Sequence, residues 1–122
     1  MRKPGHRGGK ADRIQVDWRS VIYRGIESEE IDYKAAQNWL KLSRAGKAKF
    51  ARHCIALANT KGGYIVVGVG EDSAGRPRLF TGLTDADSKS FDPTMVGNFV
   101  NRFADPEVDF DIERLVVDGK RY

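Results

Sequence analysis

The stretch 50–72, FARHCIALANTKGGYIVVGVGED, constrains the fold more than any other part of the sequence. In 50–58, apolar side chains recur every three or four residues, which is the spacing of one face of an α-helix. The Gly62–Gly63 pair tolerates the left-handed backbone conformation that ends a helix and reverses the chain. Four β-branched residues within 64–69 favour a short strand that is apolar on both faces. The stretch therefore predicts a helix packed on a central strand.

Helix and strand signals alternate through the rest of the chain, which is long enough for one domain. Before the main helix and central strand, we expect a short helix in 14–24 capped by Asp17, a strand in 27–34 and a loop in 35–46. After them, we expect a turn at 72–77, a returning strand at 78–82, a helix beginning at Asp92–Pro93, and a strand in 108–113 with an acidic outer face. The apolar face of the helix at Asp92–Pro93 consists of Met95, Val96, Phe99, Val100 and Phe103. The fold class is α/β (α+β), a single domain at 14–122 with a mixed β-sheet of about five strands, two main helices and a short N-terminal helix. Residues 1–13, rich in Gly, Arg and Lys, are expected to form a flexible basic arm.

Three side chains are assigned positions in the core. We expect Trp18 to anchor the short N-terminal helix and Trp39 to pack against the edge of the sheet. Cys54 is the only cysteine and lies on the apolar helical face, which predicts a buried, reduced thiol. The sequence has neither a run of about 18 apolar residues nor a secretory signal, so we expect a cytoplasmic protein without membrane contact.

Basic residues are concentrated in two parts of this chain, whose net charge is +4. Residues 1–13 contain five Lys or Arg residues and one acidic residue. No acidic residue occurs between Asp32 and Glu71, but seven basic residues do: Lys34, Lys41, Arg44, Lys47, Lys49, Arg52 and Lys61. This distribution is typical of a surface that binds a polyanion, and the alternative is a solvated surface whose acidic residues lie elsewhere in the fold.

Three short motifs follow one another in a fixed order. They are ES-x-x-x-(E/D)-(F/Y)-K at Glu27, Ser28, Asp32, Tyr33 and Lys34; AN-T-x-GG at Ala58, Asn59, Thr60, Gly62 and Gly63; and G-V-x-(D/E)-D-x-x-G at Gly68, Val69, Glu71, Asp72 and Gly75. In this order and spacing, the sequence resembles the Schlafen-type Alba-like domain, also described as a divergent AAA or DNA-binding domain of bacterial regulators. The resemblance covers about 22–122 and is specific for the fold.

The resemblance implies two functions. In the first, the chain is a nucleic-acid-binding module of a transcriptional regulator that contacts phosphates with weak sequence specificity, on DNA in preference to RNA. Its contact residues would be Lys34, the loop residues Arg44 and Lys47, the helix residues Lys49 and Arg52, Lys61, and the backbone N–H groups of Gly62 and Gly63. No cofactor is expected for this function.

The alternative is a metal-dependent ribonuclease, because some Schlafen relatives cleave RNA with carboxylates in these motifs. Here Glu27, Asp32 and Glu71 or Asp72 occupy the corresponding places and would hold Mg²⁺ or Mn²⁺ to activate water. The sequence departs from the catalytic pattern with Asp in place of Glu at 32 and with Gly70 directly after the strand. The shorter Asp side chain moves a ligand by about 1 Å, which matters at a metal site.

Two further possibilities are a protein-interaction domain and a nucleotide-binding domain. Gly68 and Gly70 form a G-x-G sequence, but Ser73 occupies the third glycine position of a dinucleotide fingerprint. Asp118–Gly119 is a hairpin signal followed by only three residues, which predicts a returning strand that is cut short. We therefore expect an additional C-terminal domain in the full-length protein, and a homodimer is possible.

Overall fold

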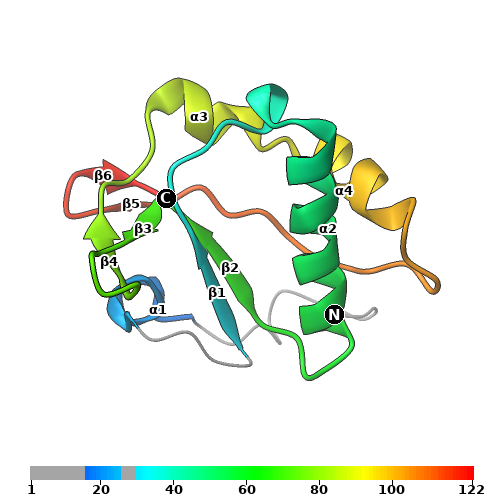
Figure 1. Ribbon diagram of the computed structural model, residues 1–122, viewed down its shortest axis with the longest axis horizontal. Helices are drawn as coiled ribbons and strands as arrows, with labels where there is room; N and C mark the ends of the chain where they lie inside the picture. The colour runs from blue at the N-terminus through cyan, green and yellow to red at the C-terminus, as the bar shows by residue number, and fades with distance from the viewer. Residues whose placement is uncertain (1–15, 26–29) are drawn as a thin grey trace.

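A computed structural model of the 122-residue chain describes residues 16–25 and 30–122 (Figure 1). Its helices are α1 (Trp18–Tyr23), α2 (Arg44–Ala58), α3 (Asp85–Ser90) and α4 (Pro93–Asn101), with a 3-10 turn, η2, at Trp39–Lys41. Its strands are β1 (Ile31–Lys34), β2 (Tyr64–Val67), β3 (Val69–Glu71), β4 (Pro77–Phe80), β5 (Val116–Val117) and β6 (Lys120–Arg121). This mixture of helices and strands confirms the α/β class. The predictions for the arm at 1–13 and for Glu27 lie outside the described residues.

The strands form three two-stranded ladders within the described residues. Strand β1 pairs in parallel with β2, whereas β3 pairs antiparallel with β4 and β5 antiparallel with β6. The predicted single mixed sheet of about five strands is therefore wrong. The reason is Gly68, which has a φ of +117° and ends β2 before β3 begins. A Cβ atom at Gly68 would lie 3.0 Å from the Tyr122 ring, so this bend leaves no room for a side chain.

Strand β2 separates two hydrophobic cores, with α1 and α2 on opposite sides of the β1–β2 pair (Figure 1). The first core consists of Ile22, Ile31, Tyr33, Val66, Val69 and Tyr122. The second consists of Trp39, Phe50, Ala51, Phe91, Val96 and Val100. Partly buried Ile65 and Val67 pack against the second core, while Val66 belongs to the first. The prediction that this strand is apolar on both faces is confirmed, but among the described residues β2 has a ladder partner on one edge only, so it is not a central strand of the described ladders.

Trp39 lies between helices and not at the edge of a sheet, so its predicted position is wrong. Its ring packs edge to face against Phe50 of α2, at a centroid distance of 5.5 Å, and against Phe99 of α4, at 5.7 Å. The Trp39 backbone N–H donates to Ser90 Oγ over 2.9 Å, which ties η2 to the end of α3. Trp39 is 1% exposed and is the largest fully buried side chain of the described residues.

Helix α2 begins at Arg44, inside the region that the sequence predicts as a loop. Ser43 caps it, because Ser43 Oγ accepts a hydrogen bond from the Gly46 N–H over 3.0 Å. Arg44 and Lys47 are therefore helical residues. The predicted cap of α4 is confirmed, since Asp92 Oδ2 accepts from the Met95 N–H over 2.9 Å. Helix α3 was not predicted, because its residues DADSKS carry no apolar periodicity.

Two predictions for the C-terminal third have different outcomes. The predicted strand at 108–113 is wrong, since the segment between α4 and β5 forms no ladder (Figure 1). Its apolar side chains pack sideways onto the second core, through Phe110 and Ile112. The predicted hairpin is confirmed: Asp118 and Gly119 have φ angles of 52° and 76°, as a tight turn between β5 and β6 requires.

Candidate functional site

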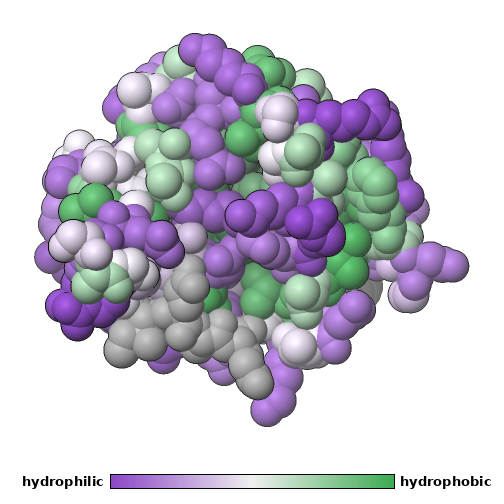
Figure 2. Space-filling model, viewed as in Figure 1, coloured by the Kyte–Doolittle hydropathy of each residue, from purple (hydrophilic) through white to green (hydrophobic). Residues whose placement is uncertain are grey.

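Helix α2 presents two exposed cations from adjacent turns. Lys49 and Arg52 are three positions apart, which places them about 60° apart around the helix, on the side away from the buried Phe50. Hydrophilic side chains gather over the middle of α2 on this face of the molecule (Figure 2). The Lys49 and Arg52 side chains therefore form a local positive surface, called here the α2 cation pair.

Apart from Lys34, which pairs with Asp32, the Lys and Arg residues of the acid-free stretch have no carboxylate partner among the described residues. Arg19 is 2.6 Å from Asp118, and Lys89 is 3.0 Å from Asp85. By contrast, no Asp or Glu within residues 16–25 and 30–122 forms an ion pair with exposed Lys41 or with the four exposed cations that were predicted as contact residues: Arg44, Lys49, Arg52 and Lys61. These four positive charges remain available to an external anion.

Two predicted contact residues do not share this surface. Lys47 is two positions from Lys49, so it lies about 160° away around α2, and its Nζ lies 5.4 Å from the centroid of the Trp39 ring. The Lys34 side chain is only 11% exposed and faces α2 from strand β1. A single continuous surface through all the predicted cations is therefore not present.

The Gly62–Gly63 turn has a structural explanation that does not involve a ligand. Gly62 has a φ of +80°, and its N–H donates to the Leu57 carbonyl oxygen over 3.0 Å, which closes the end of α2. A Cβ atom at Gly63 would lie 2.2 Å from the Glu30 carbonyl oxygen, so only glycine fits beside β1. The N–H group of Gly62 is thus already used and is not exposed for a phosphate.

Two of the candidate carboxylates have partners within the protein, Asp72 in its own turn and Asp32 in the cluster described below. Asp72 Oδ1 accepts hydrogen bonds from the backbone N–H groups of Ala74 and Arg76, each over 2.9 Å. The hydrogen bond from the Arg76 N–H is the main reason that the pKa of Asp72 lies below its usual value. Glu71 is exposed at the end of β3. No group of three His, Cys, Asp or Glu side chains in the described part of the chain is arranged to hold a metal ion.

Asp32 belongs to a partly buried polar cluster with Lys34 and His53. Its Oδ2 atom is 3.1 Å from Lys34 Nζ and 3.0 Å from His53 Nδ1, and Lys34 Nζ is 2.5 Å from the same His53 nitrogen. A carboxylate and an ammonium thus lie together on one side of β1. His53 was not among the site residues predicted from the sequence. Its position directly after Arg52, on the border of the apolar face, was the signal available.

Comparison with protein families identifies the domain. A family model described as Schlafen, AlbA_2 matches residues 27–122 of this chain. The chain belongs to the Schlafen, AlbA_2 family. The matched range contains all three motifs that predicted this relationship. No curated protein and no solved structure gave a match.

Membership of the Schlafen, AlbA_2 family indicates a function related to nucleic acids. Among the described residues, no helix is both long enough and apolar enough to span a bilayer. Within this Schlafen, AlbA_2 domain, the α2 cation pair is the part of the predicted site that the fold brings together at the surface, and the Asp32–Lys34–His53 cluster lies beneath the same helix.

The thiol of Cys54, which lines a cavity under α2, is expected to be unreactive. It forms no disulfide, and burial raises the pKa of this thiol to about 11, compared with 9.0 for an ordinary cysteine. At pH 8 we therefore expect alkylation of the native protein by iodoacetamide to be about a hundredfold slower than in urea, because the thiolate is the reactive form. Equal rates in the two states, measured by mass spectrometry, would contradict this prediction.

Proposed function

We propose that this domain binds nucleic acid through phosphate contacts, with DNA as the preferred partner, as a module of a transcriptional regulator. The supporting observation is the α2 cation pair, Lys49 and Arg52, which is exposed and has no carboxylate partner among the described residues. Two further exposed cations lie at the ends of α2: Lys61 follows the helix, and Arg44 begins it, about 140° around the axis from Lys49. Contacts of this kind fix position on a phosphate backbone but carry little sequence information. Sequence specificity would then come from a further domain or from a second copy of the chain.

The proposal predicts a strong dependence of binding on salt. If all four cations contact phosphates, the slope of log K against log salt concentration for duplex DNA is expected to be roughly −3 to −4. Retardation of a labelled duplex, titrated at salt concentrations between about 50 mM and about 200 mM, measures this slope. A slope near zero would contradict phosphate-directed binding, as would the absence of retardation at the lowest salt.

The same assay separates binding from cleavage. Labelled duplex DNA and single-stranded RNA are incubated with the protein in Mn²⁺ and in EDTA. The proposal predicts retardation in both conditions, with intact substrate and tighter binding of the duplex. Metal-dependent cleavage of RNA that disappears in Asp32→Ala would instead establish the ribonuclease alternative and overturn a function in binding alone.

A further inference from the structure

Within the part of the chain that the structure describes, the second edge of β2 has no strand beside it. The Tyr64 N–H donates to the Glu30 carbonyl oxygen over 2.6 Å, and the Gly68 N–H donates to the Lys34 carbonyl oxygen over 2.8 Å. Because peptide groups point alternately to the two edges of a strand, Ile65 and Val67 direct their N–H and C=O groups away from β1. No strand in the described ranges pairs with that edge, so it can accept a partner strand.

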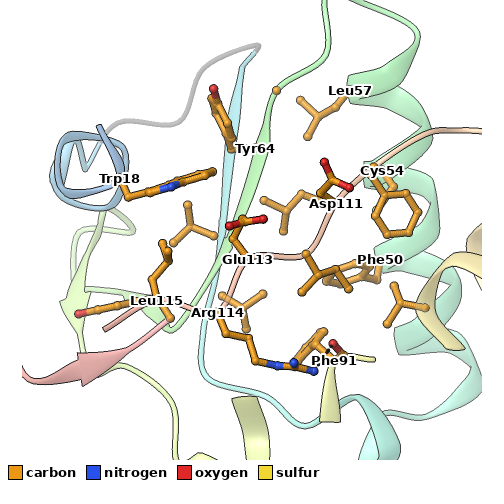
Figure 3. A pocket seen from close by; sticks show the side chains of 18 of the residues that line it. Trp18, Phe50, Cys54, Leu57, Tyr64, Phe91, Asp111, Glu113, Arg114 and Leu115 are labelled. Carbon is orange, nitrogen blue, oxygen red and sulfur yellow. Dashed lines mark hydrogen bonds between the residues drawn. The ribbon is translucent and has the colours of Figure 1, made fainter. Parts of the chain in front are cut away.

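A cavity of about 240 Å³ lies along this edge (Figure 3). Its walls include Trp18 of α1, which lies on one side of the β1–β2 pair, and Phe50, Cys54 and Leu57 of α2, which lie on the other. A cavity that reaches residues on both sides of the sheet must be at the edge of the sheet and not on one of its faces. It therefore occupies the place where a neighbouring strand would run.

The remaining wall is the segment 108–115, which crosses from α4 to β5. Residues 109–114 form no backbone hydrogen bond with any other described residue. Three exposed carboxylates alternate along this segment, at Asp109, Asp111 and Glu113, and none forms an ion pair with a described residue. Two lengths of unpaired backbone thus flank an apolar cavity that has an acidic border.

We propose that this edge binds an extended peptide in which apolar and basic side chains alternate. The peptide backbone pairs with the N–H and C=O groups of Ile65 and Val67 and adds a strand to the β1–β2 pair. Its apolar side chains fill the cavity beside Cys54 and Leu57, and its basic side chains meet the carboxylates of 109–113. The acidic border favours a basic peptide, because acidic peptide side chains beside the carboxylates of 109–113 would place like charges on neighbouring strands, which is destabilising.

The first test uses a capped hexapeptide that alternates lysine with valine, added to the isotope-labelled full chain. Nuclear magnetic resonance is expected to show the largest shifts at the amides of Ile65 and Val67, with slowed hydrogen exchange at both. The same peptide N-methylated at alternate residues, which removes the donors that face β2, is expected to bind at least about tenfold more weakly. Equal binding of the methylated peptide would overturn strand addition.

The second test reverses the charge of the border with Asp109→Lys, Asp111→Lys and Glu113→Lys together. These side chains are exposed, so circular dichroism is expected to show an unchanged fold. The lysine peptide should lose affinity by about tenfold, and a glutamate–valine peptide should gain a similar factor. The control variant carries Asp105→Lys and Glu107→Lys, which are exposed near the same segment but do not line the cavity, and it should retain wild-type binding.

Two results would overturn the proposal. One is unchanged binding of both peptides to the triple variant. The other is protection of the Ile65 and Val67 amides from hydrogen exchange in the free protein, because this would mean that 108–113 itself pairs with β2 in solution.

Discussion

Replacement of Trp39 by alanine is expected to lower the free energy of unfolding by about 3–5 kcal/mol, which is much of the stability of a domain of this size. The indole ring fills the space between α2 and α4 and contacts Phe50, Phe91 and Phe99, so its removal leaves a cavity that these rings can fill only in part. Urea unfolding followed by far-ultraviolet circular dichroism measures the loss as a shift of the midpoint.

Leu40 provides a matched control for this variant. It is the next residue in η2, but its side chain is 62% exposed, so Leu40→Ala is expected to change the free energy of unfolding by no more than about 0.5 kcal/mol. If Trp39→Ala lowers the free energy of unfolding as little as Leu40→Ala does, then Trp39 does not hold α2 and α4 together, and its ring does not pack among Phe50, Phe91 and Phe99.

The second large effect is expected on DNA binding when the α2 cation pair is reversed with Lys49→Glu and Arg52→Glu. Two phosphate contacts are lost and two repulsive charges are added, so affinity for duplex DNA should fall by about 10- to 100-fold at low salt. The slope of log K against log salt should become shallower by about 2, since each lost contact contributes about 1. Gel retardation at several salt concentrations measures both quantities.

A control with the same change in net charge separates a local surface from a general charge effect. Arg78→Glu with Lys89→Glu removes two exposed cations that lie outside α2. This variant is expected to keep nearly the wild-type salt slope and to lose less than about threefold in affinity. An equal loss in both double variants would show that overall charge attracts the DNA, and the assignment of binding to α2 would be wrong.

Local signals predicted most of the helices and turns, because each depends on neighbouring residues. The Asp92 cap, the Gly62 turn and the Asp118–Gly119 hairpin were all visible in short sequences. The strand arrangement was not, because it depends on the bend at Gly68, where distant Tyr122 and Gly82 leave no room for a side chain. The predicted position of Trp39 was wrong for the same reason. Three of the rings around it belong to positions 50, 91 and 99, and no local sequence pattern connects these positions.

The arrangement of the candidate cations could not be predicted from the sequence. In the described residues, every Lys and Arg of the acid-free stretch except Lys34 lacks a carboxylate partner. Arg44 and Lys47 were predicted to lie in a loop, but both belong to α2. The two sides of the helix to which Lys47 and Lys49 point can be predicted only when both residues are known to be helical. The inward position of Lys34 depends on packing between β1 and α2, which a short alternating strand does not specify by itself.

The crowding at Gly63 changes how this family's glycine motif should be used to assign activity. A methyl group there would overlap the carbonyl of Glu30, so the β1–β2 crossover of this chain requires the glycine whether or not the domain has a ligand. A screen of genomes for the double glycine would therefore collect proteins of one architecture, active and inactive alike. Positions free of such steric demands, such as 49 and 52, are the ones that would distinguish them.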